Sequence, residues 1–516
     1  MSDSTLLAVG LIFGLLVLAR VSRKRPRFPP GPKGLPIVGN LFGIPRDHSW
    51  LTYAEWGRLY NSNIVHFEAL GQHFFVLNDE KITKEIFEGR SQIYSDRHKT
   101  VMLHELTGWH RNWAFTPYGE SWRQNRRLFH QFFRAQAIPD YHDHMAKGAR
   151  GLVQLLLQTP ENWMRHIRHA SGSTVLDAVY AMDVDPNDNE RLEGVERAVE
   201  TLVEIAEAGG YLVDFIPALK HIPTWFPGAG FKRQAMAWKR DIDALFERPY
   251  HEVKSAMGCR IFSEQRGKAR SCVTSSLMSM FSEKLGDPDV EETIMGIAGT
   301  SYAGSDTTVF TMFAFVQAML LYPNVQRKAQ EELDRVVGRD RLPEVADRQS
   351  LPYVSAIVKE ILRWNPILPA VYHKSLADDW YEGYFIPAGS IVIGNTWAVL
   401  NDAERYPDPE PFKPERFLTA DGQLDSQVPD PVEVFGYGRR VCAGRHFAQT
   451  ALFLYIAHVL ALFTIDNPLD ESGHVIKPRR DCLTRLFWVP KPFKAKFKPR
   501  FTGVEELVHM SSIPTQ

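Results

Sequence analysis

Helical spacing dominates the pattern of apolar and polar positions along the chain. A hairpin of two strands is predicted at 64–79, IVHFEALGQHFFVLND, where apolar stretches flank Gly71, and strand patterns return at 380–395 and near the C-terminus. No internal repeat is found. The pattern predicts one mainly α domain with a minor β part. The main predicted helices are 121–134, 146–158, 192–208, 231–257, 290–320 and 324–337.

The N-terminal region has a different pattern. Residues 5–19, TLLAVGLIFGLLVLA, are uncharged and almost wholly apolar, and five basic residues follow by position 27. Positive charge after an apolar run keeps the downstream chain in the cytosol and differs from a cleaved signal peptide. We therefore predict a membrane anchor with a basic flank at 1–28. The run is shorter than the ~20 residues of a full span, so a partly inserted interfacial segment is the alternative.

The rest of the chain divides into a short connection and one large domain. Residues 29–36, PPGPKGLP, cannot form helix or central strand, because proline fixes φ and lacks an N–H donor. We predict a proline-rich hinge at 29–40 and a single globular domain at 41–516. The segment 258–272, which is polar, is predicted as a loop.

Composition excludes several classes of function. The chain has 516 residues and a formal net charge of −1, which gives no electrostatic case for nucleic-acid binding. Its four cysteines form no CxxC motif and no cluster with histidines. A disulfide framework and a structural zinc site are therefore not expected. The cysteines are Cys259, Cys272, Cys442 and Cys482.

Two stretches carry candidate chemistry. In 435–447, FGYGRRVCAGRHF, Cys442 has neither the apolar neighbours of a buried structural cysteine nor a disulfide partner. The centre of 290–320, AGTSYAGSDTT, is wrong for an ordinary core helix, because it combines glycines, the charged Asp306 and hydroxyls that can bond back to helix carbonyls. Two interpretations stay open for this helix: a kink with glycines for close packing, or a widened groove over a bound small molecule.

Three shorter patterns are weak when taken alone. Glu360 and Arg363 are spaced i, i+3 on a predicted helix, which is typical of an ordinary ion pair. Arg416, in the sequence PERF, could complete a charge network with them. Trp122 and Arg126 are spaced i, i+4 and share a helix face, as a cation–π pair or as ligands for a carboxylate.

Together and in this order, these motifs resemble those of one family, the haem-thiolate monooxygenases or cytochromes P450. The resemblance covers essentially the whole chain and is greatest to fungal microsomal members of secondary metabolism, of the O-methylsterigmatocystin oxidoreductase type. It implies the cytochrome P450 fold, with 41–516 as the catalytic domain. The matching motifs are WxxxR (Trp122, Arg126), AGSDTT (303–308), ExxR (Glu360, Arg363), PERF (414–417) and FxxGxRxCxG (435–444).

The resemblance implies a set of residues around haem b. Cys442 would be the axial thiolate of the iron, and Phe435 would shield its sulfur from water. Gly438 and Gly444 would let the backbone approach the ring. The haem propionates would bind the side chains of Trp122, Arg126, His373 and Arg440. For His373, a surface histidine is the alternative. The family commonly has proline after the cysteine, where this chain has Ala443.

The resemblance also implies how oxygen would be handled. Ala303 and Gly304 would make room for dioxygen, Thr307 would hold bound oxygen and relay protons, and Asp306 would connect that relay to solvent. Glu360, Arg363 and Arg416 would hold the cysteine loop in place. An oxygen-independent haem-thiolate isomerase or dehydratase is the alternative, and a haem-thiolate sensor without turnover is a third possibility.

Substrate and partners follow from the same resemblance. Electrons would come from NADPH through a separate cytochrome P450 reductase, steered by Arg123, Arg127, Arg439 and Arg445. The enzyme would lie on the cytosolic face of the endoplasmic reticulum, where 222–228, IPTWFPG, could dip into the bilayer. The substrate would be a hydrophobic small molecule such as a terpenoid, steroid, polyketide or aromatic compound. Expected contacts include Phe115, Tyr211, Trp225, Phe226, Ile297, Thr300, Ile367, Leu368, Val371 and Leu486.

Overall fold

The structure, a computed structural model, describes residues 26–186, 190–205, 211–261, 270–482 and 486–511. The predicted anchor lies outside these residues except for 26–28, so it stays a prediction. In the described ranges, no single helix has both the length and the apolarity needed to cross a membrane. The helices over Pro288–Leu321 and Pro323–Val336 meet that requirement only as a pair, and they are bent by 104°.

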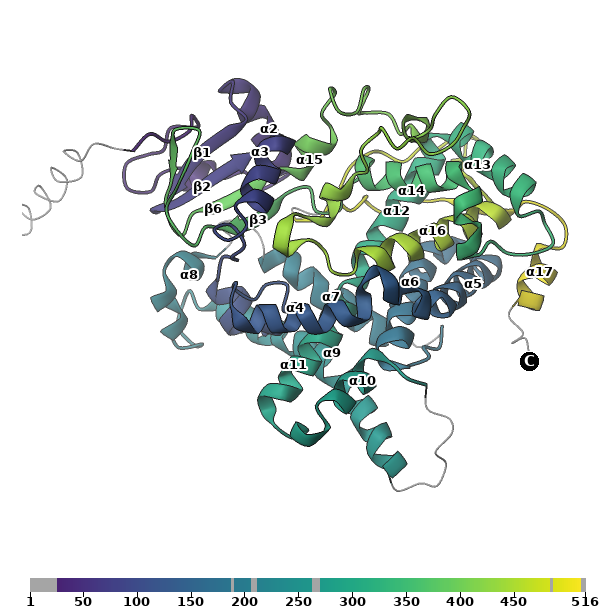
Figure 1. The fold of residues 1–516 in the computed structure, drawn as a ribbon, viewed down its shortest axis with the longest axis horizontal. Coiled ribbons are helices and arrows are strands. Elements are labelled where there is room, and N and C mark those ends of the chain that lie inside the picture. The colour runs from purple at the N-terminus through teal and green to yellow at the C-terminus, as the bar shows by residue number, and fades with distance from the viewer. Residues whose placement is uncertain (1–25, 187–189, 206–210, 262–269, 483–485, 512–516) are drawn as a thin grey trace, which may run out of the picture.

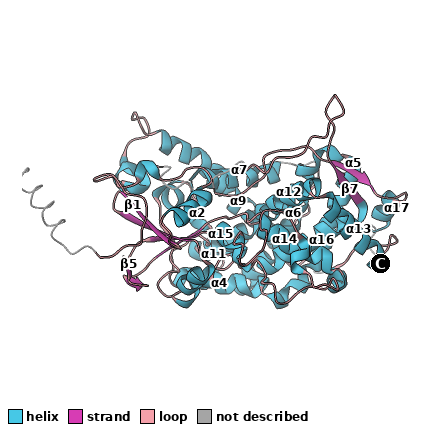
Figure 2. Ribbon diagram, turned by 90° about the horizontal axis from the view of Figure 1, so that it is seen from above, coloured by secondary structure: helices cyan, strands magenta, loops and turns pink. Residues whose placement is uncertain are grey.

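Helices form the larger body of the molecule, and the main sheet lies at one end of it (Figures 1 and 2). This arrangement confirms the predicted mainly α fold with a minor β part. The α-helices are α2 (Ser49–Leu59), α3 (Glu80–Lys84), α4 (Glu120–Phe133), α5 (His142–Gln158), α6 (Trp163–Tyr180), α7 (Glu190–Ile205), α8 (Leu212–Phe215), α9 (Gly230–Ile261), α10 (Val273–Met280), α11 (Pro288–Ala303), α12 (Ser305–Leu321), α13 (Pro323–Val336), α14 (Pro352–Trp364), α15 (Thr396–Leu400), α16 (Arg445–Leu462) and α17 (Val504–Ser511).

The main sheet has four strands in the order β1-β2-β6-β3. β1 (Ile64–Ala69) and β2 (Gln72–Leu77) form the predicted hairpin, and Gly71 in its turn has a φ of +82°. β6 (Ile391–Gly394) pairs parallel with β2 and antiparallel with β3 (Val371–Lys374). The smaller two-stranded sheets are β4 (Asp379–Tyr381) with β5 (Tyr384–Ile386), and β7 (Phe463–Asp466) with β8 (Lys496–Pro499).

The predicted helix at 290–320 is divided in two. α11 ends at Ala303 and α12 begins at Ser305, with Gly304 between them. α12 is apolar on nearly all sides and almost entirely buried, which is typical of a helix in the middle of a core. The weak point that the sequence indicated therefore lies inside the domain.

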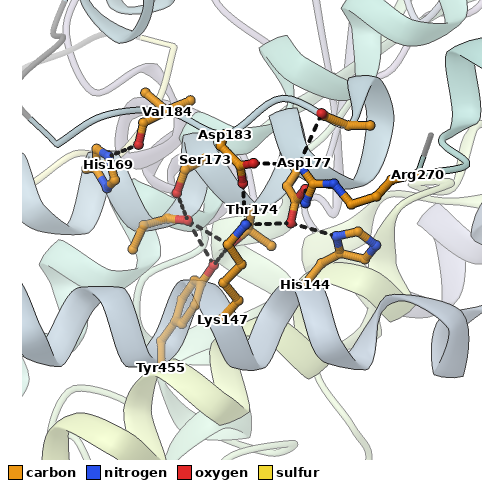
Figure 3. A network of polar contacts seen from close by, with 12 residues as sticks. His144, Lys147, His169, Ser173, Thr174, Asp177, Asp183, Val184, Arg270 and Tyr455 are labelled. Carbon is orange, nitrogen blue, oxygen red and sulfur yellow. Dashed lines mark hydrogen bonds and ion pairs between the residues drawn. The ribbon is translucent and has the colours of Figure 1, made fainter. Parts of the chain in front are cut away.

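Close packing joins α5, α6 and α16 beside this central helix. A Cβ atom on Gly148 of α5 would lie 1.9 Å from Oγ1 of Thr174 on α6, so only glycine fits there. The hydroxyl of Tyr455 on α16 donates to the same Thr174 oxygen at 2.8 Å (Figure 3).

A network of ion pairs secures the end of α6. The buried Asp177 carboxylate accepts from His144 at 2.9 Å and from Arg270 at 2.6 Å, and Lys147 lies 3.4 Å away (Figure 3). Arg270 also binds Asp183, which follows α6. The network therefore ties α5, the end of α6 and the chain before α10 to one another. Of the predicted loop 258–272, residues 258–261 belong to α9, 262–269 lie outside the described residues and 270–272 precede α10.

Candidate active site

The loop before α16 holds Cys442 in place through its own backbone. The Cys442 N–H donates to the Phe435 carbonyl at 2.7 Å, and Gly436 and Gly438 have φ values of +80° and +54°. At Gly438 an added Cβ would lie 2.2 Å from the carbonyl oxygen of Phe87. Glycine is required there because the loop packs directly against the chain at 85–89.

Cys442 lines an internal cavity with a volume of about 400 Å³. Of the three cysteines whose side chains the structure describes, Cys442 is exposed and Cys272 and Cys482 are buried, and the accessible surface of Cys442 faces the cavity. Burial in the protein raises the pKa of its thiol, while the N–H of Gly444 and the charges of Arg126 and Arg445 lower it. These groups oppose the larger effect of burial, and a bound metal ion would favour the thiolate further.

The cavity brings together residues that lie more than 300 positions apart in the sequence. Every predicted haem, metal or oxygen residue lines it except Gly438, whose contact is with the Phe87 backbone; a haem contact for Gly438 stays a prediction. The residues that line it are Trp122, Arg126, Ala303, Gly304, Asp306, Thr307, His373, Phe435, Arg440, Cys442 and Gly444.

Part of the cavity wall is cationic. The guanidinium of Arg440 lies 4.4 Å from the centre of the Trp122 ring, and Arg440 Nη1 and Trp122 Nε1 are buried without a hydrogen-bond partner among the described residues. Arg126 donates to the Val441 carbonyl at 2.7 Å. Burial lowers the pKa of Arg440 to about 9, with a smaller contribution from Arg97. Free donors beside closely spaced cations indicate a site for a carboxylate.

Arg97 was missed in the sequence. It lines the cavity and donates to the carbonyls of Tyr372 and Ala114, and burial lowers its pKa to about 10. The sequence did not indicate it, because DRHK (96–99) has no spacing that marks a cofactor ligand. Its position next to Arg440 adds a third cation to the wall.

His373 is buried on β3 and also lines the cavity. Its Nδ1 lies 2.7 Å from the Tyr94 carbonyl, and since a carbonyl only accepts, Nδ1 carries the hydrogen. Burial lowers the pKa of His373 well below its usual range, so the ring is neutral and Nε2 is left as an acceptor. The alternative of a surface histidine is wrong, whereas contact with a propionate stays a prediction.

The break at Gly304 exposes the predicted oxygen-handling residues to the cavity. The Thr307 hydroxyl donates to the Gly304 carbonyl at 2.9 Å, which leaves its lone pairs free to accept. Asp306 is buried, and its Oδ2 has no hydrogen-bond partner in the described chain but lies 3.7 Å from Arg168 Nη1. Burial raises the pKa of Asp306 to about 6. Arg168 in turn binds Glu196 at 2.8 Å.

The predicted charge network of the ExxR and PERF motifs is confirmed. Arg363 makes two hydrogen bonds to Glu360, of 2.7 and 2.8 Å, and Arg416 lies 3.1 Å from the same carboxylate. The described contacts of these three residues, however, lie at 400–416 and not in the cysteine loop.

Two other ion pairs act on the cysteine loop more directly. Glu433, two residues before Phe435, accepts from Arg405 at 3.0 Å and pairs with Lys84 at 3.0 Å. The sequence did not indicate these pairs, because none of the three residues belongs to a recognisable motif. They join the loop to α3 and to the chain after α15.

Comparison with known proteins identifies the family. The sequence model of the family described as "Cytochrome P450" matches residues 29–497. The chain belongs to the cytochrome P450 family. It is 39% identical to cytochrome P450 monooxygenase 98 of Postia placenta, an alignment that covers 98% of each chain. It is also 39% identical to tryptamine 4-monooxygenase of Psilocybe cyanescens (96% of this chain, 97% of the relative) and to cytochrome P450 monooxygenase ple1 of Rhodocybe pseudopiperita (94% and 92%).

Cytochromes P450 carry haem bound through a cysteine thiolate, and the residues of this cavity fit such a group. Cys442 offers the thiol, and the free donors of Trp122 and Arg440, with Arg97 and Arg126, suit the carboxylates of haem. The family and its relatives are monooxygenases, and nothing in them favours the isomerase alternative.

The residues expected to contact substrate divide into two groups. Five of them line the cavity: Phe115, Thr300, Ile367, Leu368 and Val371. The others are not part of its described lining, and Trp225 is 78% exposed. The predicted contacts at Tyr211, Trp225, Phe226, Ile297 and Leu486 therefore stay predictions.

Proposed function

We propose that this cytochrome P450 is a membrane-associated monooxygenase that oxidises a hydrophobic small molecule, with electrons passed from NADPH by a separate reductase. Bound haem supplies the activation of dioxygen. The observation that carries the proposal is the opening of Thr307 and Asp306 into the same cavity as Cys442. A role in secondary metabolism, with xenobiotic oxidation as the other possibility, rests on the fungal relatives alone.

Thr307 and Asp306 have the properties needed to deliver protons. With its hydrogen bond directed to the Gly304 carbonyl, the Thr307 oxygen can accept a proton donor and pass on its own hydrogen. Asp306, with a pKa of about 6, exchanges protons near neutral pH. Arg168 and the half-exposed Glu196 continue the chain of charged groups from Asp306 toward the surface.

Substitution of Thr307 separates oxygen activation from isomerisation. In Thr307→Ala we expect NADPH and O₂ consumption to continue, while the yield of product falls and that of hydrogen peroxide rises. The reason is that protons are no longer delivered in coordination with the reduction of oxygen. Thr293→Ala is the matched control, since Thr293 also donates back to a carbonyl of α11 but lies outside the cavity. Full product yield from Thr307→Ala without O₂ would instead support the isomerase.

A basic surface on the cysteine side supports the reductase as electron donor. Arg123 on α4 and Arg439 in the cysteine loop both lie over the ring of Tyr118, at 5.7 and 5.4 Å. Arg127, with 71% of its side chain exposed, continues this surface. We expect Arg127→Glu to slow reduction by the reductase and to leave reduction by dithionite unchanged. Equal slowing of both reactions would contradict the assignment of this surface.

Exposed apolar side chains before β1 and after α8 support contact with a membrane, and both elements lie at the end of the molecule that carries the main sheet (Figure 1). Ile37, Phe42 and Trp225 are 84%, 78% and 78% exposed. Together with the apolar run at 5–19, they favour the cytosolic face of the endoplasmic reticulum as the location. Fractionation of cells expressing the full chain and residues 29–516 tests this proposal: loss of the N-terminal segment should weaken membrane association.

Product analysis tests the proposed function as a whole. The full chain, co-expressed with a fungal reductase, is supplied with terpenoid, steroid, polyketide and polycyclic aromatic compounds. We expect oxidised products that carry one oxygen atom from ¹⁸O₂. Products without label, or formed equally well without O₂, would contradict a monooxygenase.

A further inference from the structure

Asn112 carries an unpaired hydrogen-bond donor in the cavity wall. It follows the short helix Trp109–Arg111, is only 6% exposed and lines the cavity. Its Oδ1 accepts from the Ala114 N–H at 3.1 Å and from the Thr300 hydroxyl at 3.3 Å. A main-chain N–H only donates, so the amide oxygen faces Ala114 and the orientation of the side chain is fixed. Its NH₂ group has no partner among the described residues.

Among the other polar groups of the described cavity lining, Trp122 and Arg440 keep free donors, which suit the carboxylates of haem. The hydroxyls of Ser171 and Ser301 donate to main-chain carbonyls. Asp306 is the one carboxylate in this lining, and it faces Arg168. The Asn112 NH₂ group is open to the cavity, so a ligand acceptor that binds there gains a hydrogen bond in mostly apolar surroundings.

We propose that Asn112, oriented by Ala114 and Thr300, donates a hydrogen bond to a neutral oxygen acceptor, such as a carbonyl, on an otherwise apolar substrate. The proposal rests on the proposed function, because it assigns the substrate class of the same cavity. It disfavours a cationic amine, since the described lining offers no unpaired carboxylate. Although this chain is similar in sequence to tryptamine 4-monooxygenase, we therefore do not expect it to act on the same class of substrate, an amine.

The helix also sets where oxidation occurs relative to the anchored oxygen. Thr300, which touches Asn112, lies on α11, whereas Thr307 lies on α12, beyond the break at Gly304. The oxidised carbon should therefore lie remote from the acceptor oxygen.

Matched pairs of ketone and hydrocarbon test the proposal. The haem-loaded full chain is titrated with fluorenone and fluorene, benzophenone and diphenylmethane, and a steroid ketone and its parent hydrocarbon. Binding is followed by tryptophan fluorescence and by the haem absorption shift. One added hydrogen bond predicts that the ketone of at least one pair binds about 3- to 10-fold more tightly than its hydrocarbon. No preference in any pair would overturn the proposal.

Two variants assign the preference to Asn112. Asn112→Leu removes the amide, and Asn112→Asp keeps both hydrogen bonds that Oδ1 accepts but loses the donor. We expect both to bind ketone and hydrocarbon equally, whereas Asn401→Leu, which removes an amide elsewhere, keeps the preference. Preference retained in both Asn112 variants would also overturn the proposal. A normal thiolate spectrum and O₂-dependent turnover in such an outcome would leave the proposed function intact.

Discussion

Replacement of Glu360 by glutamine tests the most deeply buried charges of the fold. Glu360 and Arg363 have no exposed side-chain surface, and Arg416 is 6% exposed. The Glu360 carboxylate accepts from both arginines and from the Lys413 N–H at 2.8 Å. Without its negative charge, two guanidinium groups remain buried and lose their shared counter-ion.

The magnitude follows from that loss. Removing one partner of a buried ion pair costs about 3–5 kcal/mol, a large part of the about 5–15 kcal/mol that stabilises a typical domain. We therefore expect Glu360→Gln to lower the free energy of unfolding in urea, followed by tryptophan fluorescence, by at least about 3 kcal/mol. The variant should also be purified with less haem, because the network positions the chain at 400–416 that leads toward the cysteine loop.

Glu331→Gln is the matched control. Its partner Arg327 lies at 2.5 Å, but both side chains are about 60% exposed. An exposed pair contributes about 0–1 kcal/mol, so this variant should unfold nearly as the wild type does. A cost below about 1 kcal/mol for Glu360→Gln would refute the reasoning, because it would mean that the buried arginines do not depend on the carboxylate.

Three further predictions concern stability. Burial raises the pKa of Asp306 from its ordinary 3.8 to about 6, so the folded state binds this proton more tightly than the unfolded state does. The free energy of unfolding of the wild type should therefore fall as pH rises from about 4 to 6. Asp306→Asn cannot ionise, so in urea titrations between pH 4 and 8 it should become more stable than the wild type by up to about 3 kcal/mol. Gly438→Ala should lower the free energy of unfolding by about 1–3 kcal/mol more than Gly422→Ala does, because both positions have positive φ but only at Gly438 would the added Cβ meet a neighbouring backbone. Equal losses of stability in the two variants would contradict this reasoning. Asp177→Asn should speed tryptic cleavage after Arg270 by removing one of its carboxylate partners (Figure 3), and an unchanged rate would show that Asp183 suffices.

Much of the fold could be predicted from local patterns. The α4, α5 and α13 helices and the β1–β2 hairpin follow from periodicity and turn residues, which act over short distances. The position of the break within 290–320 could not be predicted, because glycine weakens a helix without fixing where it breaks. At the break, the Gly304 carbonyl accepts from both the hydroxyl and the main-chain N–H of Thr307, three residues later.

The candidate site was predictable wherever a residue belongs to a motif. Arg97 and Asn112 belong to none, and their role depends on which chain folds against them: β3 for Arg97 and α11 for Asn112. Sequence spacing carries no information about such long-range contacts. For the same reason, Gly438 was assigned to the ring, while the structure shows the Phe87 backbone at that position.

The carbon monoxide difference spectrum of the reduced protein tests the central claim most directly. If Cys442 binds haem as a thiolate, the full chain purified with haem should give the thiolate-type spectrum, and Cys442→Ser should lose it while Cys482→Ser keeps it. Cys482 is the suitable control because it is buried away from the cavity. An unchanged thiolate spectrum in Cys442→Ser would contradict the account.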